Sequence, residues 1–393
     1  MKYDFDKIVA RENTNSLKWD RTVLTNRLGF DAEGILPLWV ADMDFRAPQP
    51  VIDALLKRVE HGIFGYSSPL DEYYDALIWW QKSRHDWDIK KEWVTMMPGI
   101  VPAFNFFIRA LTDEGDRIII QPPVYPPFRS TIETNNRIVA NNPLKLVDGK
   151  YVMDYVQLEQ LAKDPRTKML ILCSPHNPMG IVWSSEELRK LGEICNANNV
   201  IVIADEIHND LILPGNSHVT YALLGEEFAN NSIICTAPSK TFNLAGLQIS
   251  NIIIPNQSLK EKVDTELKKS SIMEPNAFGI VATTAAYTEE GADWLNQLLE
   301  YLDSNAEFIQ TFVAENMPNV KYNKPQGTYL AWLDFRDTAI AEELETKISQ
   351  EAKVLLNSGA MFGLEGKGHM RVNFACPRSI LAEALERIAK LLG

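Results

Sequence analysis

The chain has 393 residues, 46% of them hydrophobic and 23% charged, a length that suggests about two or three domains. Its net charge is −13, and so acidic a surface repels phosphate backbones and anionic lipids, which argues against nucleic acid or membranes as partners. No stretch approaches the ~20 consecutive apolar residues of a membrane span, and the polar segment 2–7 has no apolar signal core behind it. We therefore expect a cytoplasmic protein.

The cysteines and histidines indicate neither disulfides nor a metal. Cys173 and Cys235 lie inside apolar runs, and none of the four cysteines forms a CxxC pair. Buried, reduced thiols are therefore expected. The six histidines are scattered without HExxH or similar spacing, so no metal site is predicted.

The chain divides into three parts. Residues 1–45 contain asparagines that interrupt any period, and we expect this N-terminal arm to wrap across both domains and to contribute to the smaller one. Residues 46–290 alternate short apolar runs with amphipathic helical stretches, which predicts a large domain with a mainly parallel α/β sheet. Residues 291–393 are expected to form a smaller α+β domain.

Within the large domain, the apolar runs are apolar almost throughout, as strands covered on both faces require. A helix is predicted over Ser184–Asn198, because serines precede Glu186 and Glu187 at its start and stabilise its positive end. The clearest strand-like runs are Arg117–Gln121, Met169–Ser174, Val200–Ala204, Ser232–Thr236 and Asn251–Pro255.

The smaller domain has a different pattern. A long polar-faced helix is predicted over Ala292–Asn316, followed by strands at Gly327–Asp334 and Met370–Asn373. A final helix, Leu381–Leu392, completes the pattern. The sequence shows no internal repeat and no low-complexity linker.

Four polar or aromatic residues follow the apolar runs closely. In open α/β sheets, ligands bind beyond the carboxyl ends of the strands. Tyr125 follows RIIIQ, Asn177 follows MLILCS, Asp205 follows VIVIA and Lys240 follows SIICT. One ring, one amide, one carboxylate and one amine at the same edge are what a pyridine aldehyde cofactor requires.

Each of these residues has a distinct task in such a site. Lys240 would hold the carbonyl as a Schiff base and later act as a base. Asp205 would keep the ring nitrogen protonated, Asn177 would donate to the phenolic oxygen, and Tyr125 would stack on the ring. The phosphate needs N–H groups at a helix start, and Met97–Pro102 precedes a helical run.

Each residue also has an ordinary structural interpretation. A lysine in a Ser-Lys-Thr turn is usually solvated, an aspartate after a strand often caps a helix, and Asn-Pro marks many turns. Pro and Gly likewise mark many helix starts. Taken singly these interpretations are favoured, but the occurrence of all four residues at successive strand ends favours a cofactor site.

These motifs resemble a known family. Over essentially its whole length the chain is similar to the fold-type-I pyridoxal-phosphate (PLP) enzymes of the aspartate aminotransferase superfamily. SPHNPMG, ADEIH and TAPSKTFNLAGLQ resemble the cystathionine β-lyase branch of MalY/PatB type, which includes cystalysin-like C–S lyases. Leu36–Phe45 and Gln121–Phe128 are also similar to that branch. The resemblance implies a large domain with a mainly parallel, seven-stranded sheet.

The resemblance implies a role for each site residue. Lys240, Asp205 and Tyr125 are expected to be catalytic. Tyr66 is expected to reach the phosphate of the neighbouring subunit, so that a homodimer shares its active sites. Further cofactor-binding residues are expected at Gly99, Ile100, Val101, Asn177, His208 and Ser239.

The expected substrate site centres on Arg371, whose planar fork would bind the α-carboxylate of an amino acid. Val40, Ala41 and Asn177 would line the same site. The ordinary interpretation of Arg371 is an ion pair with a surface carboxylate, which would contribute little.

The sequence departs from the aminotransferase pattern at three places. His208 stands where a tyrosine is usual, Gln248 replaces the phosphate-binding arginine, and Ala237 replaces a serine. These departures fit the lyase branch, and the last two concern the phosphate site.

The expected reaction is α,β-elimination from cystathionine or a related cysteine S-conjugate, giving a thiol such as homocysteine, pyruvate and ammonia. An aminotransferase of the same fold is one alternative, and release of pyruvate and ammonia without a keto-acid acceptor separates the two. A PLP-binding regulatory protein is the other alternative, against which turnover at ordinary enzyme rates would count.

Overall fold

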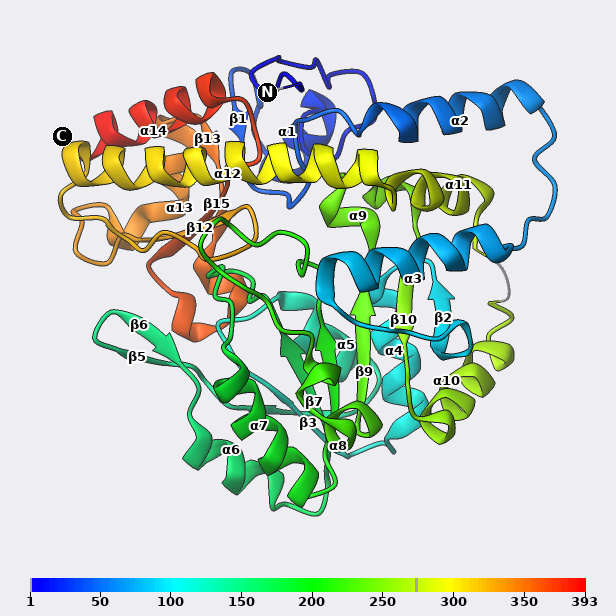
Figure 1. Ribbon diagram of the computed structural model, residues 1–393. Helices are drawn as coiled ribbons and strands as arrows, with labels where there is room; N and C mark the ends of the chain where they lie inside the picture. Colours follow the sequence, from blue (N-terminus) through cyan, green and yellow to red (C-terminus); the bar gives the residue numbers. More distant parts are fainter. Residues whose placement is uncertain (1, 273–274) are drawn as a thin grey trace.

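The computed structural model describes residues 2–272 and 275–393, in which a seven-stranded sheet and a four-stranded sheet are the main scaffolds (Figure 1). In the larger sheet, β10 is antiparallel to both of its neighbours, and the other adjacent strands are parallel. The predicted mainly parallel α/β sheet is thus confirmed. In spatial order the strands are β2 (Val94–Met97), β10 (Ser250–Ile253), β9 (Ser232–Thr236), β8 (Ile201–Asp205), β7 (Thr167–Cys173), β3 (Arg117–Ile120) and β4 (Ile138–Asn141).

Helices cover both faces of this sheet, which is why its central strands are apolar throughout. On β7, Met169 and Ile171 belong to one apolar core, whereas Leu170 and Leu172 belong to the other. The first core is covered by α4 (Ile100–Leu111), α5 (Pro126–Thr134) and α10 (Gln257–Lys269). The second is covered by α3 (Asp71–His85), α6 (Tyr155–Ala162), α7 (Ser185–Ala197) and α11 (Ala277–Ala286).

The helix predicted after the Asn-Pro segment is α7, and its start is confirmed in detail. Ser184 is the N-cap, and its hydroxyl accepts a hydrogen bond from the backbone N–H of Glu187. The Glu187 carboxylate in turn accepts one from the Ser184 backbone N–H. This capping box satisfies two N–H groups that a helix start otherwise leaves unpaired.

The smaller scaffold is built around α12 (Glu289–Asn316), which Figure 1 shows running from α11 toward the chain's C-terminal helix, α14 (Arg378–Leu392). The helices and strands predicted for this part are confirmed, although α12 begins three residues earlier than expected. The domain boundaries after residues 45 and 290 stay a prediction. The antiparallel sheet has the order β11 (Lys321–Tyr322), β12 (Leu330–Asp334), β15 (His369–Asn373) and β14 (Asn357–Ser358).

The remaining elements are short, except for α2 in the large scaffold. β1 pairs with β13 in parallel, and β5 pairs with β6 as a hairpin. These elements are α1 (Arg21–Leu28), β1 (Leu36–Pro37), α2 (Gln49–His61), β5 (Lys145–Val147), β6 (Lys150–Val152), α8 (Glu226–Asn230), α9 (Pro238–Thr241), α13 (Leu344–Thr346) and β13 (Val354–Leu355).

The N-terminal arm contacts both scaffolds. The hydroxyl of Tyr301 on α12 donates to the Asp6 carboxylate at 2.5 Å. The amide of Asn243, just after α9, donates to the backbone carbonyls of Met43 and Phe45. No helix in the described ranges is long and apolar enough to cross a membrane, and all four cysteines are buried free thiols.

Candidate active site

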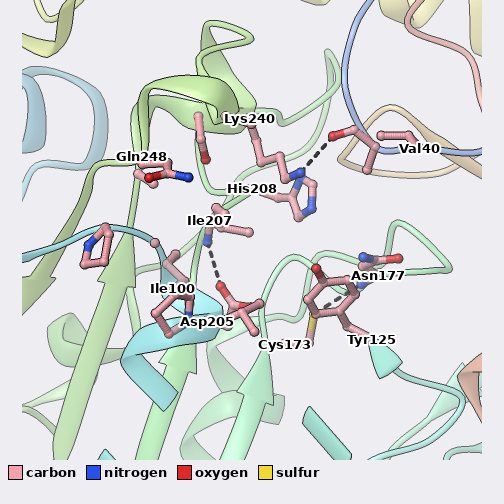
Figure 2. Close-up of a pocket in the computed structure, with 18 of the residues that line it drawn as sticks. Val40, Ile100, Tyr125, Cys173, Asn177, Asp205, Ile207, His208, Lys240 and Gln248 are labelled. Carbon is pink, nitrogen blue, oxygen red and sulfur yellow. Dashed lines mark hydrogen bonds between the residues drawn. The ribbon is translucent and has the colours of Figure 1, made fainter. Parts of the chain in front are cut away.

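A cavity of about 360 Å³ lies at the carboxyl edge of the large sheet. Tyr125 follows β3, Asn177 follows β7, Asp205 ends β8, and Lys240 stands on α9 just after β9. All four residues line the cavity, and Figure 2 shows their side chains around one common space. The structure therefore brings together the four residues predicted to surround the cofactor ring.

Among the described residues, one hydrogen bond holds the Lys240 amine in the cavity, from its Nζ to the Ala41 carbonyl oxygen at 2.7 Å (Figure 2). Burial, followed by the positive charge of Arg371, lowers the pKa of Lys240 to about 8, although Asp42 and Asp205 act in the opposite direction. An amine with this pKa is partly neutral near pH 7 and can therefore act as a nucleophile or a base. The solvated lysine of the ordinary interpretation is not what the structure contains.

Asp205 is a buried carboxylate, with only 4% of its surface exposed. Burial raises its pKa to about 7, partly offset by the backbone N–H of Ile207 and the charge of Lys240. Within the part of the chain that the structure describes, no cation forms an ion pair with it. A buried carboxylate is stabilised in its charged form by a nearby positive charge, which a protonated pyridine nitrogen would supply.

Arg371 lies on β15, with 5% of its surface exposed. Its Nη1 donates to Asn177 Oδ1 at 2.8 Å, and its Nη2 donates to the Trp39 carbonyl at 2.9 Å and to Asn357 Oδ1 at 2.7 Å. No carboxylate pairs with it in the described residues, so the surface ion pair of the ordinary interpretation is wrong. The neutral acceptors leave its charge available for an anionic ligand.

The hydrogen bond from Arg371 fixes the orientation of the Asn177 side-chain amide. Its Oδ1 accepts from Arg371, so its Nδ2 is the group left to donate into the cavity. This orientation agrees with the predicted hydrogen bond to a phenolic oxygen, which itself stays a prediction.

The opposite side of the cavity has the chemistry of an anion site. Gly99 is the N-cap of α4, so the first N–H groups of that helix have no intrahelical partner. Gly99, Ile100, Val101 and Ser239 line the cavity here, and Figure 2 places Ile100 away from Tyr125 and Asn177. Unpaired N–H groups at a helix start bind phosphate readily.

Gln248 also lines the cavity, and Figure 2 shows it on the same side as Ile100. Its backbone is left-handed, with φ 49° and ψ 62°, at the end of a short helical turn. The lysine and arginine lining the described cavity are Lys240 and Arg371, both assigned to other tasks. The phosphate side therefore offers neutral donors, in agreement with the departure seen at Gln248.

His208 and the segment of Val40 and Ala41 line the cavity as predicted. Burial, then the charges of Lys240 and Arg371, lowers the pKa of His208 well below its usual range, so its ring is neutral. Its Nδ1 has no partner within the described residues. Its ring contacts that of Tyr329 edge to face, with 6.0 Å between ring centroids.

Tyr66 is the one predicted site residue that does not line this cavity. It lies in the segment 62–70 between α2 and α3, and its side chain is fully exposed. Its predicted contact with the site of a neighbouring subunit stays a prediction.

Several lining residues were missed by sequence reasoning. Asn357 lies on β14, directly opposite Arg371 in the small sheet, and Trp39 contributes a backbone carbonyl rather than a side chain. No local pattern marks either residue, because strand pairing and chain path bring them to the site. The remaining lining residues that were not predicted as site residues are Cys173, Ile207, Ala237, Ala245, Gln248 and Ile249, together with Pro98 and Pro102 of the predicted phosphate segment Met97–Pro102; two of these, Ala237 and Gln248, were noted as departures.

Comparison with known proteins agrees with this geometry. The family described as aminotransferase class I and II matches residues 34–388. Cystathionine β-lyase PatB of Bacillus subtilis is 43% identical over 99% of this chain and 100% of its own length. Protein MalY of Escherichia coli is 33% identical over 98% of this chain and 97% of its own.

Solved structures give the same result. The crystal structure of cystalysin from Treponema denticola, which contains a pyridoxal 5'-phosphate cofactor, matches with a TM-score of 0.95 and 37% identity. The match covers 100% of this chain and 99% of that one. The chain therefore belongs to the aminotransferase class I and II family, in the branch that contains PatB, MalY and cystalysin.

Proposed function

We propose that this chain is a PLP-dependent C–S β-lyase that cleaves cystathionine or a related cysteine S-conjugate into a thiol, pyruvate and ammonia. The observation that carries the proposal is the meeting of Lys240, Asp205 and Arg371 in one cavity. They provide an amine, a carboxylate for a ring nitrogen and a cation for a substrate carboxylate. The relatives named PatB and cystalysin, at 43% and 37% identity, support the lyase over the aminotransferase.

The residues present fit PLP as the cofactor. The cavity has the size of small-ligand pockets, which begin at about 300 Å³. The unpaired Asp205 carboxylate would hold the pyridine nitrogen, the Asn177 amide the phenolic oxygen, and the start of α4 the phosphate. When bound, PLP supplies an electron sink for the pair left on Cα after a proton is removed.

Lys240 has two tasks in this reaction. Its Nζ would be the group that holds the cofactor aldehyde in the resting site. Its amine, when free beside the substrate Cα, would take the Cα proton, as its lowered pKa allows. Asp205 would be the group that keeps the pyridine nitrogen protonated.

Arg371 orients the substrate. Its guanidinium plane is fixed by the Trp39 carbonyl and by the Asn177 and Asn357 oxygens, and the fork matches a carboxylate in two hydrogen bonds. Burial raises the pKa of Tyr125, so its hydroxyl stays protonated while the ring faces the cofactor. Substrate recognition therefore needs an α-carboxylate beside the amine that reacts.

A direct assay tests the proposed reaction. The purified holoenzyme is incubated with cystathionine, cystine, cysteine, or alanine with a keto acid, and pyruvate, ammonia and thiol are measured. The proposal expects pyruvate and ammonia from a thioether without any keto acid. Activity only with the alanine and keto-acid pair would favour the aminotransferase instead, and no turnover at all would favour the regulatory protein.

We also propose that the chain works as a homodimer with shared sites, in a reducing compartment such as the cytoplasm. Buried free thiols support the compartment. Several large apolar side chains on α2 and in segment 62–70 are exposed, which supports the dimer, because protein interfaces cover apolar surface of this kind. They are Leu56, Val59, Ile63, Phe64, Tyr66 and Leu70.

Mixed dimers test the shared site. Tyr66→Phe should loosen PLP, and Lys240→Ala should abolish turnover. A dimer of one Tyr66→Phe and one Lys240→Ala subunit contains one site with both original residues, so partial activity should return. Mixed dimers that form without any restored activity would contradict the shared site.

A further inference from the structure

A cluster of four charged residues lies outside the cavity and joins two parts of the N-terminal segment: residues 2–38, called the arm from here on, and residues 39–44, here called the strap. Arg11 bridges both carboxylates of the strap, at 2.6 Å from Asp42 Oδ2 and 2.6 Å from Asp44 Oδ1. Lys18 Nζ is 2.8 Å from Asp44 Oδ2. We call these four residues the charge cluster. Its two positive charges come from the arm and its two negative charges from the strap.

The Lys18–Asp44 pair of the charge cluster is buried to a degree that ion pairs rarely reach. The side chain of Lys18 is entirely covered, and that of Asp44 is 4% exposed. The indole N–H of Trp19 donates to Asp44 as well, at 2.8 Å. Removing one member would leave the cluster with one uncompensated charge beside the buried Lys18–Asp44 pair, which is unfavourable. The arm and the strap are therefore fastened together as one unit.

The strap in turn holds two residues of the active site by its backbone. The Trp39 carbonyl accepts from Arg371 Nη2 at 2.9 Å. The Ala41 carbonyl accepts from Lys240 Nζ at 2.7 Å and from the Tyr329 hydroxyl at 2.8 Å. A carbonyl cannot be adjusted by rotating a side chain, so its position depends on where the strap lies.

A third tie joins the strap to the small sheet. The amide of Asn373, two residues after Arg371 on β15, donates to the Val40 and Asp42 carbonyls at 2.6 and 2.5 Å. The strap is thus bonded to Lys240 of the large scaffold and to β15 of the small one. Its outer side is fastened to the arm by the charge cluster, by the Trp19 hydrogen bond to Asp44 and by the contact of the Arg27 guanidinium with the Trp39 ring.

We propose that the charge cluster is a positioning device for the active site, which fixes the strap so that the Trp39 and Ala41 carbonyls hold Arg371 and Lys240 in place. The inference rests on the proposed function, because it takes Arg371 as the group that binds the substrate carboxylate. The competing explanation is that the cluster only ties down the arm. In that case it would affect stability and leave recognition unchanged.

The two explanations differ in what the loss of the cluster does to carboxylate recognition. In the described part of the chain, Asp205 on β8 and the start of α4 form no hydrogen bond with the strap, so their contribution to PLP binding should be kept in either case. The PLP content checks Lys240, which does bond to the strap. Arg371 would lose its fixed carbonyl only if the cluster positions the strap. The affinity for an amino acid would then fall, and the affinity for an analogue without a carboxylate would not.

The test compares glycine with glycinamide on holoenzyme variants. Their dissociation constants are measured from the change in the visible absorbance of the bound cofactor, and the ratio of the two isolates the carboxylate. In Lys18→Met and Arg11→Gln we expect the preference for glycine to fall about tenfold, as the loss of one hydrogen bond to a charged group would give. Asp6→Ala is the control, because Asp6 ties the arm to Tyr301 on α12 and, among the described residues, forms no hydrogen bond or ion pair with the strap.

Thermal unfolding and PLP content are measured on the same samples. If Lys18→Met does not fold, Arg11→Gln still tests the inference. The Arg11 side chain is 21% exposed, so its replacement leaves no cavity in an apolar core. An unchanged glycine preference in a folded, less stable variant would overturn the inference. A wild-type enzyme that binds glycine and glycinamide equally would overturn the proposed role of Arg371, before any cluster variant is made.

Discussion

Replacing Asp205 by asparagine should stabilise the cofactor-free protein at alkaline pH while removing most of the activity of the holoenzyme. Burial holds the pKa of Asp205 at about 7 in the folded chain, against the ordinary value of 3.8. At 1.36 kcal/mol per pH unit, the difference between these pKa values corresponds to about 4 kcal/mol. This is the cost of keeping the carboxylate charged with no pyridinium beside it.

The direction of the pH dependence follows from the raised pKa. The folded chain keeps the Asp205 proton at a higher pH than the unfolded chain, so protonation stabilises the fold fully below about pH 3.8. That contribution is lost as the pH rises through about 7. Asparagine carries no charge at any pH, so its advantage should be about 4 kcal/mol at pH 8 and about 2 kcal/mol at pH 5.

Urea unfolding of the cofactor-free wild type and Asp205→Asn at pH 5 and pH 8 measures this difference. The turnover of the two holoenzymes is compared in parallel, because an amide cannot stabilise a protonated pyridine nitrogen. A variant that is equally destabilised at both pH values would refute the buried, unpaired carboxylate. Near-wild-type turnover would show that another group supplies the negative charge.

Three further predictions concern other parts of the site. The rate at which cofactor-free protein captures PLP should rise with pH, reach half its maximum near pH 8 and level off about one unit higher, because Lys240 reacts as the neutral amine and its pKa is about 8; a half-maximum near the ordinary lysine pKa of about 10.4 would contradict this. Arg371→Lys should weaken every amino-acid substrate alike, by roughly tenfold or more, with PLP content unchanged; substrate-dependent effects in steady-state kinetics would argue against a carboxylate site. Gly180→Ala should destabilise the fold by more than about 2 kcal/mol, because its φ is +65° and a new Cβ would lie 2.4 Å from Pro325 Cβ and 2.6 Å from the Gly327 carbonyl; an unchanged melting temperature would refute it.

The large sheet could be predicted because its central strands carry an unmistakable pattern. Both faces of β7, from Met169 to Leu172, are buried in apolar cores, so the run is apolar without interruption. The edge strands β2 and β4 were missed. β4 has four residues, of which only Ala140 is buried, and such a short, half-exposed segment has no clear period.

The residues of the site likewise fall into two groups, those that could be predicted from the sequence and those that could not. Lys240, Asp205 and Asn177 could be predicted because each closely follows a strand, and the carboxyl ends of these strands meet at one edge. Asn357 could not, because it reaches Arg371 through the pairing of β14 with β15. Trp39 could not either, because it acts through a backbone carbonyl whose position depends on the path of the strap.

The most direct test of the central claim is the identity of the lysine that carries the cofactor. Borohydride reduces the C=N bond between a lysine and the PLP aldehyde carbon to a stable amine. Peptide mapping then locates the modified residue. We expect that Lys240 alone is labelled in the wild type and that Lys240→Ala yields no labelled peptide. Labelling of any other lysine in the wild type would contradict the site as described.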